Sequence, residues 1–307
     1  MRVAVVDLGT NSTRLLVTDI DGDGAIRDLE RRSEVTRLGQ GVDSTGELSE
    51  GAIGRVYAVL DDYRATIDQL GAQTVTGVLT SAVRDAANGA DFATTIRERY
   101  GIDARTIPGE EEAELTFVGA TSERPRDDKT PLMVCDIGGG STEIVVGRPD
   151  AVDFFTSVQA GVVRQSERHL RSDPPDPHEL QALAAEVRGA IAAAVPEEVR
   201  ARACEAIAVA GTATSCAAID LGLEPYDRER VQGHVLEEGT LELLLARLAG
   251  MSEDERREVV GLHPDRAPTI VAGVTILLEV MRAFGRDRVE VSDHDLLRGT
   301  ALRVARA

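Results

Sequence analysis

The pattern of apolar and polar positions predicts an α/β protein. Residues 2–6 are expected to form a buried strand, residues 14–18 its hairpin partner and residues 25–38 a third strand, so the chain is expected to begin with an antiparallel sheet. Ser49 is a good N-cap, and apolar residues then recur at helical spacing until Gly71. Further helices are expected at 92–100, from 109, and at 162–170, 179–194, 236–248, 252–260, 269–284 and 294–304, and further strands at 74–80, 103–107, 152–157, 206–210 and 289–291. This alternation is typical of mixed sheets flanked by helices.

Two stretches of the chain, residues 5–17 and 134–146, repeat one pattern. Each has an apolar run that ends in Asp, a glycine-containing turn with Ser and Thr, and a second apolar run. Aligned without a gap, the equivalent residues are Asp7 and Asp136, Gly9 and Gly138, Ser12 and Ser141, and Thr13 and Thr142. A matched pair of this kind predicts two similar domains that face each other across a cleft.

The repeated turns are candidate anion-binding loops. Glycine has no Cβ, so backbone N–H groups can approach an anion closely, and the Ser and Thr hydroxyls add donors. Asp136 and Glu143 lie at the two rims of the second turn and could hold a divalent cation through their oxygens. Arg14 stands in the first copy where Glu143 stands in the second. A plain hairpin turn is the alternative for either stretch alone, and the repetition favours ligand binding.

Composition narrows the class of protein. The chain has 307 residues, of which 42% are hydrophobic and 28% charged, enough for two domains with ordinary cores. The net charge of −19 argues against nucleic-acid or membrane-surface binding but leaves a phosphate ligand open. Cys135, Cys204 and Cys216 have no metal-ligand spacing and are expected to be buried, reduced thiols. Without a signal peptide or an apolar run of about 20 residues, a cytoplasmic protein is expected.

Polar residues 122–131, with prolines toward both ends, predict a linker between domains at 1–121 and 132–293. The terminal helix, 294–307, is expected to pack back on the first domain. Arg164, Arg168 and Arg171 form a basic stripe on one predicted helix. The stripe would either line a polyanion path or face solvent.

The motifs together resemble one family. The paired turns, with Gly211-Thr-Ala-Thr, resemble the actin, Hsp70 and sugar-kinase ATPase fold, in which each of two actin-like (ribonuclease H-like) domains has a mixed sheet flanked by helices. Within that fold, the chain resembles the short two-domain form of the exopolyphosphatase and guanosine pentaphosphate phosphohydrolase (Ppx/GppA) family. The stretches that carry this resemblance are Asp7-Leu-Gly-Thr-Asn-Ser-Thr-Arg, Thr80-Ser-Ala-Val-Arg-Asp-Ala-Ala-Asn, Pro108-Gly-Glu-Glu-Glu-Ala and Asp136-Ile-Gly-Gly-Gly-Ser-Thr-Glu.

The resemblance implies residue roles. Glu111 would be the general base, and a shift of one residue in the run of three glutamates would make Glu110 or Glu112 the base instead. A carboxylate beside other carboxylates is expected to have a raised pKa. Asp136 and Glu143 would hold Mg²⁺ (or Mn²⁺), with Asp7 as a further candidate. The phosphate contacts would be Gly9, Thr10 (usually Ser in the family), Asn11, Ser12, Arg14, Arg84, Gly138, Gly139, Gly140, Ser141 and Thr142.

The implied activity is release of orthophosphate from the ends of inorganic polyphosphate by base-activated water, in a cytoplasmic homodimer. Long members of the family carry an extra helical C-terminal domain, so this chain is expected to prefer short polymers. A guanosine pentaphosphate 5′-phosphohydrolase is the alternative within the family. An ATP-dependent small-molecule kinase and a non-catalytic actin-like regulator are the alternatives from other classes.

Overall fold

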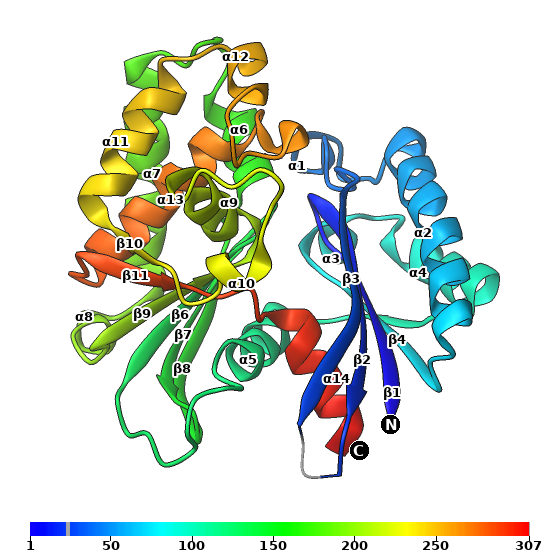
Figure 1. Cartoon of the computed structure of the whole chain (residues 1–307). Helices are drawn as coiled ribbons and strands as arrows, with labels where there is room; N and C mark the ends of the chain where they lie inside the picture. The colour runs from blue at the N-terminus through cyan, green and yellow to red at the C-terminus, as the bar shows by residue number, and fades with distance from the viewer. Residues whose placement is uncertain (23–24, 307) are drawn as a thin grey trace. The chain divides into compact units, whose positions relative to one another are not determined.

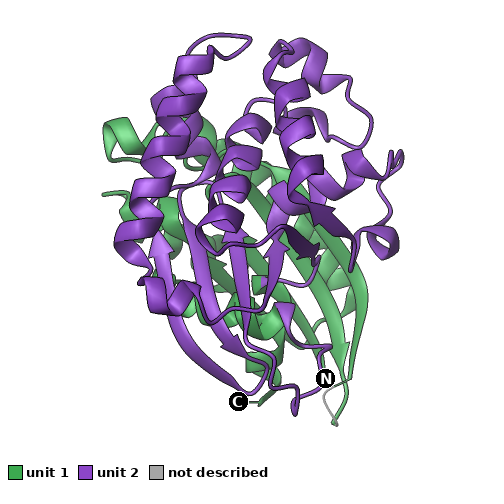
Figure 2. Cartoon of the chain, turned by 90° about the vertical axis from the view of Figure 1, so that its left-hand side faces the viewer, with its two compact units in different colours: residues 1–119, 296–307 green, residues 120–295 purple. Residues whose placement is uncertain are grey.

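The computed structural model describes residues 1–22 and 25–306, which form two units (Figure 1). The first consists of Met1–Gly119 and Leu296–Ala307, of which Ala307 lies outside the described residues, and the second of Ala120–Asp295 (Figure 2). The segment 122–131, expected as a linker, belongs to the second unit. There Arg124 donates to carboxylate oxygens of Glu205 at 2.6 Å and Glu290 at 3.0 Å, which ties this segment to the sheet of its own unit.

The first unit is built on a five-stranded sheet of order β3-β2-β1-β4-β5. The strands are β1 (Arg2–Leu8), β2 (Ser12–Ile20), β3 (Ile26–Val35), β4 (Thr74–Leu79) and β5 (Asp103–Thr106). Strands β1, β2 and β3 pair antiparallel, whereas β4 and β5 continue the sheet in parallel from β1. The expected antiparallel start of the chain is therefore confirmed.

Helices cover both faces of this sheet, and the alternation along β1 assigns its side chains to them. The helices are α1 (Val42–Thr45), α2 (Glu50–Leu70), α3 (Ser81–Asp85), α4 (Gly89–Tyr100), α5 (Gly109–Ala120) and α14 (Leu296–Arg306). Val3 and Val5 are buried in one cluster with Leu297 and Ala301 of α14. Ala4, Val6 and Leu8 belong to a second cluster that includes the buried face of α2. Such alternation is the side-chain period of a strand buried on both faces.

The expected ends of α2 are confirmed. The Ser49 side chain accepts a hydrogen bond from the amide of Ala52, which satisfies one of the free N–H groups of the first turn. Gly71 ends the helix with φ 68°, a left-handed conformation that costs little only for glycine.

The second unit has a six-stranded sheet of order β10-β11-β9-β6-β7-β8. The strands are β6 (Leu132–Ile137), β7 (Thr142–Arg148), β8 (Ala151–Val158), β9 (Glu205–Val209), β10 (Val235–Glu237) and β11 (Arg288–Val291). Three antiparallel strands followed by two parallel ones repeat the order of the first sheet, and β10 is added antiparallel at the edge. The repeat seen in the sequence is therefore a repeat of topology.

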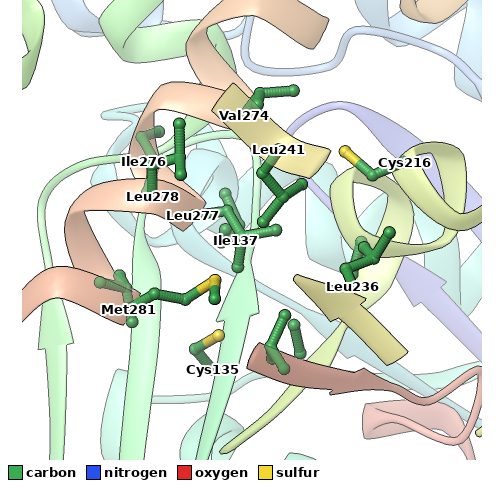
Figure 3. Packing of buried hydrophobic residues seen from close by; sticks show 14 of the residues in the cluster. Cys135, Ile137, Cys216, Leu236, Leu241, Val274, Ile276, Leu277, Leu278 and Met281 are labelled. Carbon is green, nitrogen blue, oxygen red and sulfur yellow. The ribbon is translucent and has the colours of Figure 1, made fainter. Parts of the chain in front are cut away.

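The core of the second unit is aliphatic. Its helices are α6 (Val162–His169), α7 (Pro177–Ala194), α8 (Glu197–Arg200), α9 (Ala210–Asp220), α10 (Arg228–Val231), α11 (Glu238–Ala249), α12 (Glu253–Arg257), the 3₁₀ turn η1 (Pro264–Arg266) and α13 (Ile270–Ala283). Cys135 and Ile137 of β6 lie in one buried cluster with Leu277 and Met281 of α13 (Figure 3). With no Trp in the chain, close packing rests on branched aliphatic side chains.

Two expectations about this unit are corrected. Residues 235–237 form β10, so the helix expected from 236 begins only at Glu238. Cys204 is exposed at the start of β9, whereas Cys135 and Cys216 are buried. Burial raises the pKa of each buried thiol to about 12, which keeps both protonated. None of the helices in the described part of the chain combines the length and the apolar character needed to cross a membrane.

Candidate phosphate-binding site

The two repeated turns have the same backbone geometry. We refer to residues 9–13, between β1 and β2, as loop 1 and to residues 138–142, between β6 and β7, as loop 2. In loop 1 the Gly9 amide donates to the Ser12 carbonyl at 3.0 Å, and in loop 2 the Gly138 amide donates to the Ser141 carbonyl at 3.0 Å. A Cβ added to either glycine would lie 3.0–3.1 Å from that carbonyl oxygen, so a side chain would press on the turn.

Helix α6 fixes the orientation of loop 2. Its first residues donate to all three carbonyl groups of the glycine run: Val162 N to Gly138 O at 2.9 Å, Val163 N to Gly139 O at 2.8 Å, and Arg164 Nε to Gly140 O at 2.8 Å. A planar trans peptide directs its carbonyl and the next N–H to opposite sides, so the amides of Gly139, Gly140 and Ser141 point away from α6. Within residues 1–22 and 25–306 these three amides donate no hydrogen bond. Loop 2 is therefore a preformed group of donors for an anion.

Loop 1 is held by a different segment, residues 36–39. The Gly39 amide donates to Thr10 O at 2.8 Å, and the Arg37 amide donates to Asn11 O at 2.8 Å. Arg37 has φ 49°, which is uncommon outside glycine. Gly39 is required here because an added Cβ would lie 2.2 Å from Thr10 Cγ2. The buried Asn11 Oδ1 accepts no hydrogen bond from any described residue. As an acceptor it suits a donor or a cation, whereas a phosphate oxygen would need the Nδ2 group of Asn11 as its donor.

The rims of the two loops carry opposite chemistry. In the first unit, Arg14 pairs with the buried Asp7, with 2.6 Å between Nη2 and Oδ2. In the second unit, Asp136 stands opposite Glu143 in the β6–β7 register, and both are at most 5% exposed. Ser157 Oγ donates to Glu143 Oε1 at 2.7 Å. One rim is thus an ion pair, and the other brings two carboxylates together.

The carboxylate rim suits a divalent cation better than the ion-pair rim does. Mg²⁺ is commonly held by one or two carboxylates while water and substrate phosphates complete its shell, and Asp136 with Glu143 fits that donor set. Asp7 is engaged by the Arg14 guanidinium, which speaks against it as a further metal ligand. No cluster of three or more His, Cys, Asp or Glu side chains suited to a metal occurs among the described residues.

Arg84 and Glu112 meet in the first unit. Arg84 lies in α3, directly after β4, and its Nη1 donates to Ile107 O at 2.9 Å and to Glu112 Oε2 at 3.3 Å. Glu112, in the first turn of α5, is 7% exposed. The carboxylate is therefore buried beside a guanidinium that is itself anchored to the backbone.

Glu111 has a different environment. Arg105 donates to both of its carboxylate oxygens, at 2.7 and 2.5 Å, and Arg303 of α14 donates to Oε1. These contacts, the hydrogen bond from Arg105 foremost, lower the pKa of Glu111. The prediction that the pKa of Glu111 is raised is wrong, because its nearest charged neighbours are guanidinium groups rather than other acids. Glu110 is exposed.

The three arginines of the predicted basic stripe have different environments. Arg164 contacts loop 2, whereas Arg168 pairs with Glu186 of α7 at 2.9 Å and Arg171 is exposed. Sequence reasoning missed the start of α6 as part of the site. The available signal was Gly161, which precedes the helix and would place a Cβ 2.4 Å from Gly139 O.

Comparisons with known proteins agree with this geometry. The model of the Ppx/GppA phosphatase family matches residues 16–305. Exopolyphosphatase 2 of Mycobacterium tuberculosis is 36% identical over 316 residues, which cover 99% of this chain and 98% of that protein. A crystal structure of an exopolyphosphatase-like protein superposes with a TM-score of 0.92 at 34% identity, covering 100% and 99% of the two chains. The Aquifex aeolicus Ppx/GppA family member gives a TM-score of 0.82 at 30% identity, covering 99% and 97%. The expected α/β architecture, with two units that each contain a mixed sheet flanked by helices, is confirmed.

Proposed function

Because the chain belongs to the Ppx/GppA phosphatase family, we propose that it is an exopolyphosphatase, which releases orthophosphate from the ends of inorganic polyphosphate. The observation that carries this proposal is loop 2, whose three amides face away from α6 and form a receptor for an anion. The exopolyphosphatase with 36% identity over nearly the full length of both chains supports the choice of substrate.

In the first unit, we assign the general base to Glu112 in place of Glu111. A base must be able to approach the attacking water and take up its proton, and Glu111 is committed to Arg105 and Arg303. Glu112 is buried, and its contact with Arg84 fixes one carboxylate oxygen. Arg84 is then placed to stabilise phosphate oxygens close to the base.

In the second unit, the amides of loop 2 bind and orient phosphate oxygens. Phosphoryl transfer depends mainly on positioning and on charge stabilisation, and preformed donors supply both without reorganising during the reaction. The amides of loop 1 and the Nδ2 group of Asn11 supply the corresponding donors in the first unit. Arg14 acts there through Asp7, since their ion pair holds the rim of loop 1.

Asp136 and Glu143 are the residues that would hold Mg²⁺ (or Mn²⁺). The bound cation would neutralise negative charge on the phosphoryl oxygens. The protein's own part is to keep two carboxylates together in a buried position, which requires the rigid β6–β7 register and the hydrogen bond from Ser157.

Guanosine pentaphosphate is the second candidate substrate, because it presents a terminal phosphoanhydride to the same groups and the family name includes it. The family resemblance also leads us to propose a cytoplasmic homodimer. Light scattering of the purified protein tests the dimer independently of activity.

The deciding experiment measures phosphate release with Mg²⁺ from short polyphosphate, long polyphosphate, guanosine pentaphosphate and ATP. We expect release from short polyphosphate, and its loss in Glu112→Gln. Release from guanosine pentaphosphate alone would assign the second activity. Absence of release from all four would refute the hydrolase, and ATP consumption only with an acceptor, or nucleotide-dependent assembly, would then indicate a kinase or an actin-like regulator.

A further inference from the structure

The start of α6 contacts loop 2 more closely than helix packing alone requires. Two carbonyls of the loop are held by helix backbone amides, but the third, Gly140 O, is held by the Nε of a side chain, Arg164, at 2.8 Å. Gly161 admits this approach, because a Cβ there would lie 2.4 Å from both Gly139 C and Gly140 C. The whole contact therefore depends on two residues that lie outside the loop.

We propose that Arg164 is a positioning residue that sets the affinity of loop 2 for the phosphate groups of the substrate. The inference rests on the proposed function and deepens it. The peptide between Gly140 and Ser141 is the last one of the glycine run, and its carbonyl direction fixes where the Ser141 amide points. Arg164 fixes that direction, and so it acts on the substrate through the Ser141 amide.

The chemistry of arginine explains the choice of residue. Its guanidinium is planar and presents Nε–H in a fixed direction, so one hydrogen bond defines the orientation of the acceptor. Lysine would keep the positive charge, but its ammonium is a point donor on a flexible stem. A positioning role therefore predicts that lysine cannot replace Arg164, whereas a general electrostatic role predicts that it can.

Arg168 provides a matched control on the same helix. It carries the same charge one turn further along, and its guanidinium pairs with Glu186 of α7. If the stripe acted as a path for a polyanion, removal of either arginine would weaken binding. If Arg164 positions loop 2, only its removal has this effect.

The test compares wild type, Arg164→Ala, Arg164→Lys and Arg168→Ala. The KM for short polyphosphate and the inhibition constant of inorganic phosphate are measured beside kcat and the melting temperature. For Arg164→Ala we expect KM and the phosphate inhibition constant to rise about tenfold, the effect of one charge-assisted hydrogen bond, while kcat changes much less. Arg164→Lys should behave like Arg164→Ala, and Arg168→Ala like wild type.

Gly161→Ala tests the same contact from the other side, because it pushes α6 away from loop 2 and should raise KM in the same way. If Arg164→Ala does not fold, Arg164→Gln is measured by the same criteria. Wild-type KM in Arg164→Lys, or equal effects of Arg164→Ala and Arg168→Ala, would overturn the inference. Absence of phosphate release by the wild-type protein would instead refute the proposed function, so the two failures are distinguishable.

Discussion

Replacing Glu112 by glutamine should abolish phosphate release, whereas the same change at Glu111 should mainly destabilise the fold. The two residues are adjacent in sequence, yet one contacts Arg84 and the other Arg105 and Arg303. Glutamine keeps the size of each side chain, removes the negative charge and replaces one acceptor oxygen by an NH₂ donor. The comparison therefore separates the role of the base from that of the ion-pair network.

The magnitudes follow from these contacts. Loss of a general base lowers kcat by about 10²- to 10⁴-fold, so Glu112→Gln should retain at most about 1% of the wild-type rate. The amide oxygen introduced by Glu112→Gln can still accept the hydrogen bond from Arg84, but the buried ion pair loses its negative charge, so the melting temperature of this variant should also fall. Glu111→Gln weakens a partly buried network of charge-assisted hydrogen bonds, which costs about 2 kcal/mol of unfolding free energy, and should keep kcat within about tenfold of wild type.

The assay is phosphate release from short polyphosphate at saturating Mg²⁺, with kcat and KM determined for each variant. Thermal unfolding followed by circular dichroism reports stability on the same samples. Glu110→Gln, at an exposed position in the same turn, is the control for the change of charge.

The opposite result would refute the reasoning. If Glu111→Gln folds and is inactive while Glu112→Gln retains the wild-type rate, the assignment of the base to the buried carboxylate is wrong. If Glu110→Gln, Glu111→Gln and Glu112→Gln all fold and keep the wild-type rate, the base lies outside this turn.

Further predictions concern stability, pH, metal and salt. Gly299→Ala should cost about 3 kcal/mol in denaturant unfolding, because its Cβ would lie 1.8 Å from Leu115 O; an unchanged midpoint would contradict this packing. Because the pKa of Glu111 is lowered from 4.5 in the folded protein, its stabilising effect is present above that value and lost as pH falls through the folded-state pKa. The difference in melting temperature between wild type and Glu111→Gln should therefore shrink in acid, and a constant difference would rule out this linkage. Glu143→Gln should raise the Mg²⁺ concentration for half-maximal activity at least about tenfold in a titration, and an unchanged value would remove Glu143 from the metal site. With a net charge of −19 and an anionic substrate, kcat/KM should rise with moderate KCl, and a fall would indicate local attraction that exceeds the overall repulsion.

The repeated loops and the antiparallel start of the chain could be predicted from sequence, because both depend on local patterns. Each loop needs glycine at one fixed place in a hairpin, and that requirement is visible in the residues. The identity of the base was not visible in the same way. The assignment depends on Arg84, 28 positions before Glu112, and on Arg303, 192 positions after Glu111. Only the fold decides which glutamate each arginine contacts.

Short elements could not be predicted from sequence for a related reason. Strand β10 has three residues, and its ladder with β11 defines it more than its own composition does. Cys204 sits beside apolar residues in sequence but lies at the exposed start of β9. Neighbours along the chain predict the element, whereas burial depends on where that element begins and ends.

The division of the chain also has a consequence for how the protein is made. The first unit is discontinuous, because α14 follows the second unit in the chain, and the second unit is one continuous stretch between its two parts. A ribosome therefore releases every residue of the second unit before the first can be completed. Until α14 has been synthesised, Val3 and Val5 lack the contacts of Leu297 and Ala301, and Glu111 lacks Arg303. A chain that lacks α14 thus leaves α5, the helix that carries Glu111 and Glu112, without its contact from Arg303.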